Sequence, residues 1–283
     1  MDDWIIANIY VLVKTYPVLS KKYESLICTA GIWEKNENYQ LIRMYPVSFD
    51  FYKSQYGKLK KFTKIQVEIK RAKEKLNRPD SYKVRFDRFK VLDDELTNTR
   101  KKEVWQKRNY LVKQVSYKSL ELLDDLKEQE GRSLGVIKPQ KVIDFTRTKK
   151  ENSAKWEQDL LNGNQEILEK YISGRSYLEV RPIEYIPWIF RYHFKCNDLR
   201  CKGHNIMCED WELLQLWRNL KIDADKKGII LSDDKRFEKL RNKFFDYFLN
   251  KRDLNFIMGT ESYYNNWLII GVYYPPKDIP LDI

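Results

Sequence analysis

The sequence predicts an α+β protein, because strand-like and helix-like segments are interspersed without the regular alternation of a βαβ fold. The clearest strand is 64–70, where apolar and polar residues alternate as on a half-buried strand. Residues 100–115 and 119–129 have helical patterning, and the second segment ends near Gly131. Glycine and proline number only 10 and 9 among 283 residues, which argues against a collagen-like or broadly disordered chain.

The N-terminal region is predicted to be rich in strands. Residues 5–13 are apolar and β-branched, which indicates a buried strand. Residues 27–33 and 39–45 are extended in pattern on either side of 34–38, which has turn composition, so a hairpin is expected. Residues 82–91 alternate less strictly and are expected to form a further strand.

The second half of the chain mixes both kinds of element. The polar, charged segment 146–164 is the best linker candidate, which divides the chain into a β-rich basic domain (1–148) and a metal-containing α+β domain (165–283). Ser232 is a good N-cap for a helix that follows it. Strands are expected at 134–145, 177–194, 255–258 and 267–274, and helices at 209–220 and 232–249.

Positive charge is concentrated in the middle of the chain. Residues 51–115 hold 20 Lys or Arg against 8 Asp or Glu, so this segment carries the whole formal net charge of +12. Such concentration is typical of a surface that binds nucleic acid, DNA or RNA, although a solvated face gives the same count. The side chains expected to contact phosphates are Lys58, Lys60, Lys61, Lys64, Lys70, Arg71, Arg85, Arg88, Arg100, Lys101, Lys102, Lys107 and Arg108.

A cysteine- and histidine-rich segment predicts a metal site. Cys196, Cys201, His204 and Cys208 follow the spacing Cys-x4-Cys-x2-His-x3-Cys and comprise three of the four cysteines in the chain. Three thiolates and one imidazole are a common tetrahedral ligand set for structural zinc. A helical start at 204–208 would place the last two ligands on one face. The site is expected to fasten helix 209–220 to the preceding strands.

Two other arrangements of this segment are open. Asp210 can replace Cys208 as the fourth ligand, and His193 is a further candidate. Alternatively, the cysteines are buried and free, and no ion binds. Zinc is the cofactor that the spacing favours.

Short motifs occur along nearly the whole chain. They are Lys-Thr-Tyr-Pro (14–17), Cys-Thr-Ala-Gly (28–31), Arg-Met-Tyr-Pro (43–46), Arg-Pro-Asp-Ser-Tyr (78–82), Ser-Leu-Gly (133–135), Cys-Lys-Gly-His (201–204), Asp-Trp-Glu (210–212) and Gly-Val-Tyr-Tyr-Pro-Pro (271–276). Together they resemble a family of uncharacterised bacterial proteins without an assigned activity. The resemblance implies one inseparable unit, metal positions at Cys196, Cys201 and His204 but not at Cys208, and a place in phage defence or a mobile element.

These observations favour a nucleic-acid-binding protein with a structural zinc site. One alternative is a metal-dependent nuclease, in which Glu68 holds Mg²⁺, Lys70 stabilises developing charge and Asp50 supplies a second carboxylate. Another is a protein-interaction subunit of a larger complex. The chain has no run of 18 apolar residues and an acidic start, so a cytoplasmic protein without membrane spans is expected.

Overall fold

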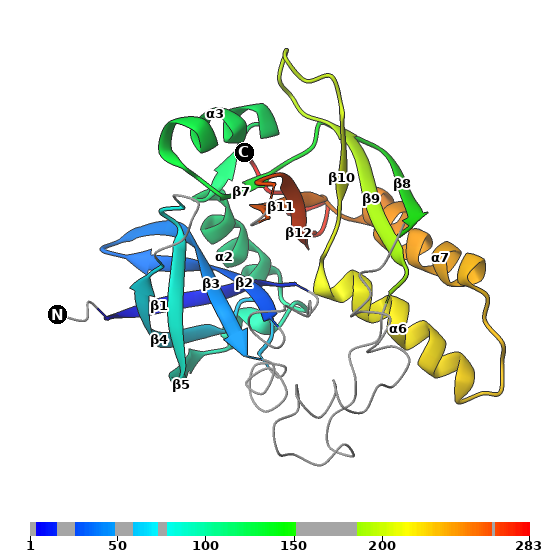
Figure 1. The fold of residues 1–283 in the computed structure, drawn as a ribbon, viewed down its shortest axis with the longest axis horizontal. Helices are drawn as coiled ribbons and strands as arrows, with labels where there is room; N and C mark the ends of the chain where they lie inside the picture. Colours follow the sequence, from blue (N-terminus) through cyan, green and yellow to red (C-terminus); the bar gives the residue numbers. More distant parts are fainter. Residues whose placement is uncertain (1–3, 16–25, 49–58, 73–77, 151–185, 262–263) are drawn as a thin grey trace.

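The computed structural model describes residues 4–15, 26–48, 59–72, 78–150, 186–261 and 264–283. These residues form a strand-rich N-terminal half and a C-terminal half of helices and strands, which lie side by side (Figure 1). The predicted α+β class is confirmed. Among the described residues, every helix is too short or too polar to cross a membrane.

The N-terminal half is a closed five-stranded barrel with strand order β1-β2-β3-β5-β4. Its strands are β1 (Ile5–Lys14), β2 (Leu26–Lys35), β3 (Asn38–Ser48), β4 (Lys64–Arg71) and β5 (Ser81–Asp93). β1 closes the barrel against β4 in antiparallel register, whereas β3 meets β5 in parallel. This is the topology of an OB-fold, a small Greek-key barrel.

Side-chain alternation divides the barrel strands between two cores. Ile9, Trp33, Ile42 and Ile65 point inward and fill the barrel, because successive residues on a strand face opposite sides. The tight β2–β3 turn places Asn36 and Glu37 at positive φ. The hairpin predicted around 34–38 is therefore confirmed.

The outer face of β1, β2 and β3 is also buried. It packs on helix α2 (Lys102–Lys113), on strand β7 (Leu134–Ile137) and on strand β12 (Trp267–Tyr273), which together form the second core. Ala30, Ile32 and Leu41 lie in this core beside Trp105 of α2 and Ile270 of β12. The barrel is thus covered on one side by the C-terminal half, as Figure 1 shows.

Two sheets build the described part of the C-terminal half. One has the order β10-β9-β8 and the other β12-β11-β7-β6. The strands not yet located are β6 (Ser116–Tyr117), β8 (Lys141–Lys149), β9 (Trp188–Lys195), β10 (His204–Met207) and β11 (Asn255–Thr260). The helices are α3 (Leu120–Glu130), α6 (Trp211–Asp225), α7 (Asp233–Arg241) and α8 (Phe248–Lys251), with a 3-10 turn at Glu95–Thr97.

Aromatic side chains dominate the core of this half. Phe190, Tyr192 and Trp217 are fully or almost fully buried there, with the ring centroids of Phe190 and Trp217 5.3 Å apart. A π-helical segment, Asn242–Tyr247, continues α7 into α8. The Tyr192 hydroxyl donates to the carbonyl of Phe244 in this segment, at 2.6 Å.

Most predicted elements coincide with observed ones. The helical start that would have placed His204 and Cys208 on one face is not formed, because 204–207 is strand β10, paired antiparallel with β9. A linker is predicted at 146–164. The described part of this range is the end of β8, which also pairs with β9. The predicted helical turn at 20–25 lies outside the described residues.

Candidate metal centre and basic surface

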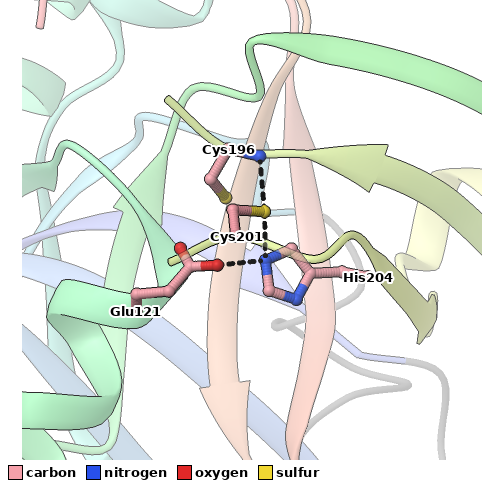
Figure 2. A group of neighbouring side chains, drawn as sticks. All are labelled: Glu121, Cys196, Cys201 and His204. Atoms are coloured by element: carbon pink, nitrogen blue, oxygen red, sulfur yellow. Dashed lines mark hydrogen bonds and ion pairs between the residues drawn. The ribbon is translucent and has the colours of Figure 1, made fainter. Parts of the chain in front are cut away.

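Three elements bring four candidate ligands together (Figure 2). Glu121 lies in the first turn of α3, whose N-cap Ser119 accepts a hydrogen bond from the backbone N–H of Leu122. Cys196 directly follows β9, Cys201 lies in the connection between β9 and β10, and His204 is the first residue of β10. Helix α3 and the β9–β10 connection therefore approach each other at this point.

The ligand atoms of these four side chains all lie within 4.8 Å of one another. His204 Nε2 is 3.0 Å from Glu121 Oε1 and 3.3 Å from Cys201 Sγ. Zinc bonds of about 2.0–2.3 Å in a tetrahedron place neighbouring ligand atoms about 3.3–3.8 Å apart. The donor atoms are therefore near enough to one another, and of the right kinds, that the cluster could hold a metal ion.

Hydrogen bonds around the cluster support this interpretation. The backbone N–H of Leu120 donates to Cys196 Sγ at 3.5 Å, and the N–H of Cys196 donates to Cys201 Sγ at 3.2 Å. Such bonds orient sulfur ligands and stabilise their charge. Glu121 Oε2 is buried without a hydrogen-bond partner, although a buried carboxylate oxygen normally has one. Burial raises the pKa of the Cys196 thiol to about 12.

The turn between Cys196 and Cys201 is anchored to α3. Asp198 accepts a hydrogen bond from the Ser119 hydroxyl at 3.0 Å, and Arg200 pairs with Asp125 at 3.0 Å. The hydrogen bonds from Arg200 lower the pKa of Asp198 to about 2. These contacts hold two of the candidate ligands in place independently of any ion.

The structure brings together three of the four predicted ligands and adds Glu121. Cys208 lies outside the cluster. It is buried against β12, and its backbone forms an isolated β-bridge with Ile269. Asp210 is the N-cap of α6, with its oxygens engaged by backbone N–H groups. His193 Nε2 lies 3.0 Å from the hydroxyl oxygen of Thr146.

Two of the cations expected to bind phosphates face inward. Lys61 pairs with Asp210 and Glu212, each at 3.1 Å. Burial lowers the pKa of Lys61, but the two carboxylates raise it more, so the net shift is upward. The guanidinium of Arg108 lies over the rings of Phe62 and Trp105 and is buried, and this burial lowers its pKa to about 10.

Four other expected cations form ion pairs on the barrel and α2. Lys64 pairs with Glu34 at 2.7 Å, and Lys107 pairs with Glu95 at 3.0 Å. Arg85 and Arg88 both pair with Glu68, at 2.9 and 3.4 Å. The hydrogen bond from Arg85 is the main cause that lowers the pKa of Glu68.

Five of the remaining expected cations are exposed. Lys70 is half-buried on β4, and Lys58 lies outside the described residues. The exposed ones are Lys60, Arg71, Arg100, Lys101 and Lys102.

Glu68, the Mg²⁺ ligand expected in the nuclease alternative, is already engaged by other side chains. Both oxygens of Glu68 accept hydrogen bonds from arginine side chains, which occupy the places a metal ion would take. Asp50, the expected second carboxylate, lies outside the described residues.

Comparisons with known proteins place the chain in a family. Residues 113–282 match a domain of unknown function (DUF8757), which covers more than half of the chain, so the protein belongs to this family. Residues 6–114, which contain the barrel, match a second domain of unknown function (DUF8758). The two matches meet at the end of α2. The resemblance to an uncharacterised family is confirmed.

Comparisons with curated proteins and with solved structures do not assign a function to the chain. No curated protein matches the chain. A crystal structure of the Ifi202 HINa domain in complex with 20-bp double-stranded DNA matches at 9% identity and a TM-score of 0.28, over 73% of this chain and 78% of that chain.

Proposed function

We propose that the protein binds nucleic acid through its N-terminal barrel and that a zinc ion stabilises its C-terminal half. The observation that carries the first part is a closed OB-type barrel whose strands β4 and β5 lie within segment 51–115, the segment that accounts for the net positive charge of the chain. OB-fold barrels commonly bind oligonucleotides or oligosaccharides, and Lys and Arg provide the contacts to phosphates.

The exposed cations continue beyond the barrel onto α2. Arg100 and Lys101 precede this helix and Lys102 begins it, and all three are exposed. Phosphate contacts of this kind determine affinity and salt dependence but carry no sequence information. Binding that is strong at low salt and indifferent to sequence is therefore expected.

The test is a titration of the full chain with labelled duplex DNA, single-stranded DNA and RNA at several salt concentrations, with Mg²⁺ and with chelator. Salt-dependent binding without cleavage supports the proposal. Mg²⁺-dependent cleavage lost in Glu68→Gln would instead support the nuclease alternative. Absence of binding to all three probes would overturn the proposal and favour an interaction subunit.

For the metal, the donor set is the supporting observation. Two thiols, an imidazole and a carboxylate are all ligands that Zn²⁺ accepts. With four protein ligands the site is closed, which is typical of a structural ion rather than a catalytic one. Bound there, zinc would fasten α3 to the β9–β10 connection.

Metal content and stability test this part separately from nucleic-acid binding. Purified protein is expected to contain one zinc per chain, and Cys201→Ser or Glu121→Gln should lower both zinc content and melting temperature. Cys208→Ser is the matched control, because Cys208 is buried outside the cluster and its loss should leave zinc content at one per chain. Metal-free wild-type protein, or zinc lost on Cys208→Ser and kept on Cys201→Ser, would refute the assignment.

The further expectation of a role in phage defence or a mobile element remains a prediction from the family resemblance. The binding and metal measurements neither require it nor test it.

A further inference from the structure

The side of the barrel that an OB-fold generally offers to a ligand is covered in this protein. That side is formed by strands 2 and 3. Here Ala30, Ile32 and Leu41, which point outward from β2 and β3, are buried in the core shared with α2 and β12. A nucleic acid cannot reach these strands without separating the two halves.

Polar contacts fasten the same side. Arg43 on β3 is buried and donates to the backbone carbonyl and the hydroxyl of Ser133, each at 3.1 Å. Asp80, in the turn before β5, accepts from the N–H of Ser133 at 2.7 Å and from its hydroxyl at 2.5 Å. Separating the barrel from Ser133 would break these hydrogen bonds and leave the buried Arg43 without them, so exposing this side of the barrel has a high free-energy cost.

The opposite side of the barrel, formed by β4 and β5, faces solvent. In Figure 1 these strands lie away from α6 and α7. On β4, Ile65, Val67 and Ile69 point inward, so Gln66, Glu68 and Lys70 point outward. These outward side chains of β4 are half-buried, whereas Lys83, Arg88 and Lys90 of β5 are exposed, so the described part of this face is accessible to solvent.

Cations line this face. By register, Lys70 is opposite Lys83, Glu68 is opposite Arg85, and Gln66 is opposite Lys90. Lys83 and Lys90 are exposed, and the side chain of Arg88 is 61% exposed. Among the described side chains of 66–70 and 83–90, the outward cations are Lys70, Lys83, Arg85, Arg88 and Lys90, and the outward carboxylate is Glu68; at the end of the two strands Lys64 is opposite Asp93.

We propose that the outer face of β4 and β5 is the surface that binds the phosphate backbone of nucleic acid. The inference rests on the proposed nucleic-acid-binding function and assigns it to a side of the barrel that OB-folds do not generally use. Sequence-independent contact to phosphates is expected, because the face offers cations rather than a row of aromatic rings.

One feature of the face favours a polyanion. Glu68 fixes the guanidinium groups of Arg85 and Arg88, and Arg85 also lies over the ring of Trp4, 4.2 Å from its centroid. Guanidinium groups held in place lose less conformational entropy when they bind phosphate.

The test compares two double variants of the full chain. Lys83→Gln with Lys90→Gln removes two exposed cations from the face, and Lys226→Gln with Lys227→Gln removes two exposed cations at the end of α6. Each pair lowers the net charge by the same amount. Binding to a labelled 20-bp duplex is measured from about 0.05 to 0.5 M salt, and melting temperatures check that both variants stay folded.

If both lysines contact phosphates, the salt slope of log K for the first pair should become shallower by about 1.8, and affinity at 0.1 M salt should fall roughly 10- to 60-fold. The α6 pair should keep the wild-type slope. Equal slopes for the two pairs, with wild-type binding intact, would overturn this inference and leave the proposed function standing. Wild-type protein that binds no nucleic acid would overturn both.

Discussion

Replacement of Lys61 by methionine tests whether this residue is part of the fold rather than of a phosphate-binding surface. Lys61 precedes β4 and reaches Asp210 and Glu212 at the start of α6, so it connects the barrel to the C-terminal half. Its side chain is 15% exposed and that of Asp210 is 0% exposed. A methionine side chain at this position would fill a similar volume but leave the Asp210 carboxylate buried without its cation.

The expected loss of unfolding free energy in Lys61→Met depends on the partners that Asp210 and Glu212 retain. Removal of one partner of a buried ion pair costs about 3–5 kcal/mol. Asp210 retains hydrogen bonds from the backbone N–H groups of Glu212, Leu213 and Val272, at 2.8–3.1 Å. Glu212, with its side chain 37% exposed, can be rehydrated. The lower end of the range, about 3 kcal/mol, is therefore expected.

Urea unfolding at pH 7 measures this loss, with Lys60→Met as the control, because Lys60 is the exposed neighbour. The control should change the unfolding free energy by less than about 0.5 kcal/mol. Adding Asp210→Asn completes a double-mutant cycle, and a coupling of at least about 1.5 kcal/mol is expected for a pair in direct contact. If Lys61→Met costs no more than Lys60→Met, or flattens the salt dependence of DNA binding in its folded state, the structural role is refuted.

Three other changes test the fold. Burial and the nearby charge of Lys61 lower the pKa of Lys14 to about 8, below the 10.5 of a free lysine. Between these two pH values the unfolded chain binds more protons than the folded protein, so the free energy of unfolding should rise from pH 8 to 10. In Lys14→Met this rise, up to about 3 kcal/mol, should disappear from pH-dependent urea titrations, and an unchanged rise would contradict the assignment. Gly31→Ala should cost about 1–3 kcal/mol in the same assay, because the new Cβ would lie 2.4 Å from Ile9 Cγ2 and 2.8 Å from the carbonyl oxygen of Tyr10. Ser232→Ala should cost about 1 kcal/mol, because the hydroxyl caps α7 by accepting from the N–H of Lys235, whereas Ser232→Thr should retain most of it.

The elements with strong local signals were predictable from the sequence. The alternation in β4 and the Ser119 and Gly131 boundaries of α3 are dictated by residues within a few positions of one another. The closure of the barrel was not predictable, because the parallel contact between β3 and β5 has only two paired positions and no sequence signature. Strand β10 was not predicted, because its pairing with β9 lies outside the local pattern.

The candidate metal site was likewise predictable only in part. Cys196, Cys201 and His204 are close in sequence, and spacing alone indicated them. Glu121 gave no such signal, because an acidic residue in the first turn of a helix is common for electrostatic reasons alone. Only the packing of α3 on the β9–β10 connection brings it to the sulfur atoms, where its buried, unpartnered oxygen distinguishes it from other acidic residues of the helix.

The cations of the middle segment show why a charge count overestimates a binding surface. Lys60 and Lys61 are neighbours in a loop, yet one is exposed and the other is held by two carboxylates of the C-terminal half. No periodicity separates them, since the loop has none. On β4 and β5, by contrast, the alternation that sends Ile69 inward sends Lys70 outward. Directional information in the sequence is thus greatest on the strands, and the inferred phosphate-binding face lies where that information and the open surface coincide.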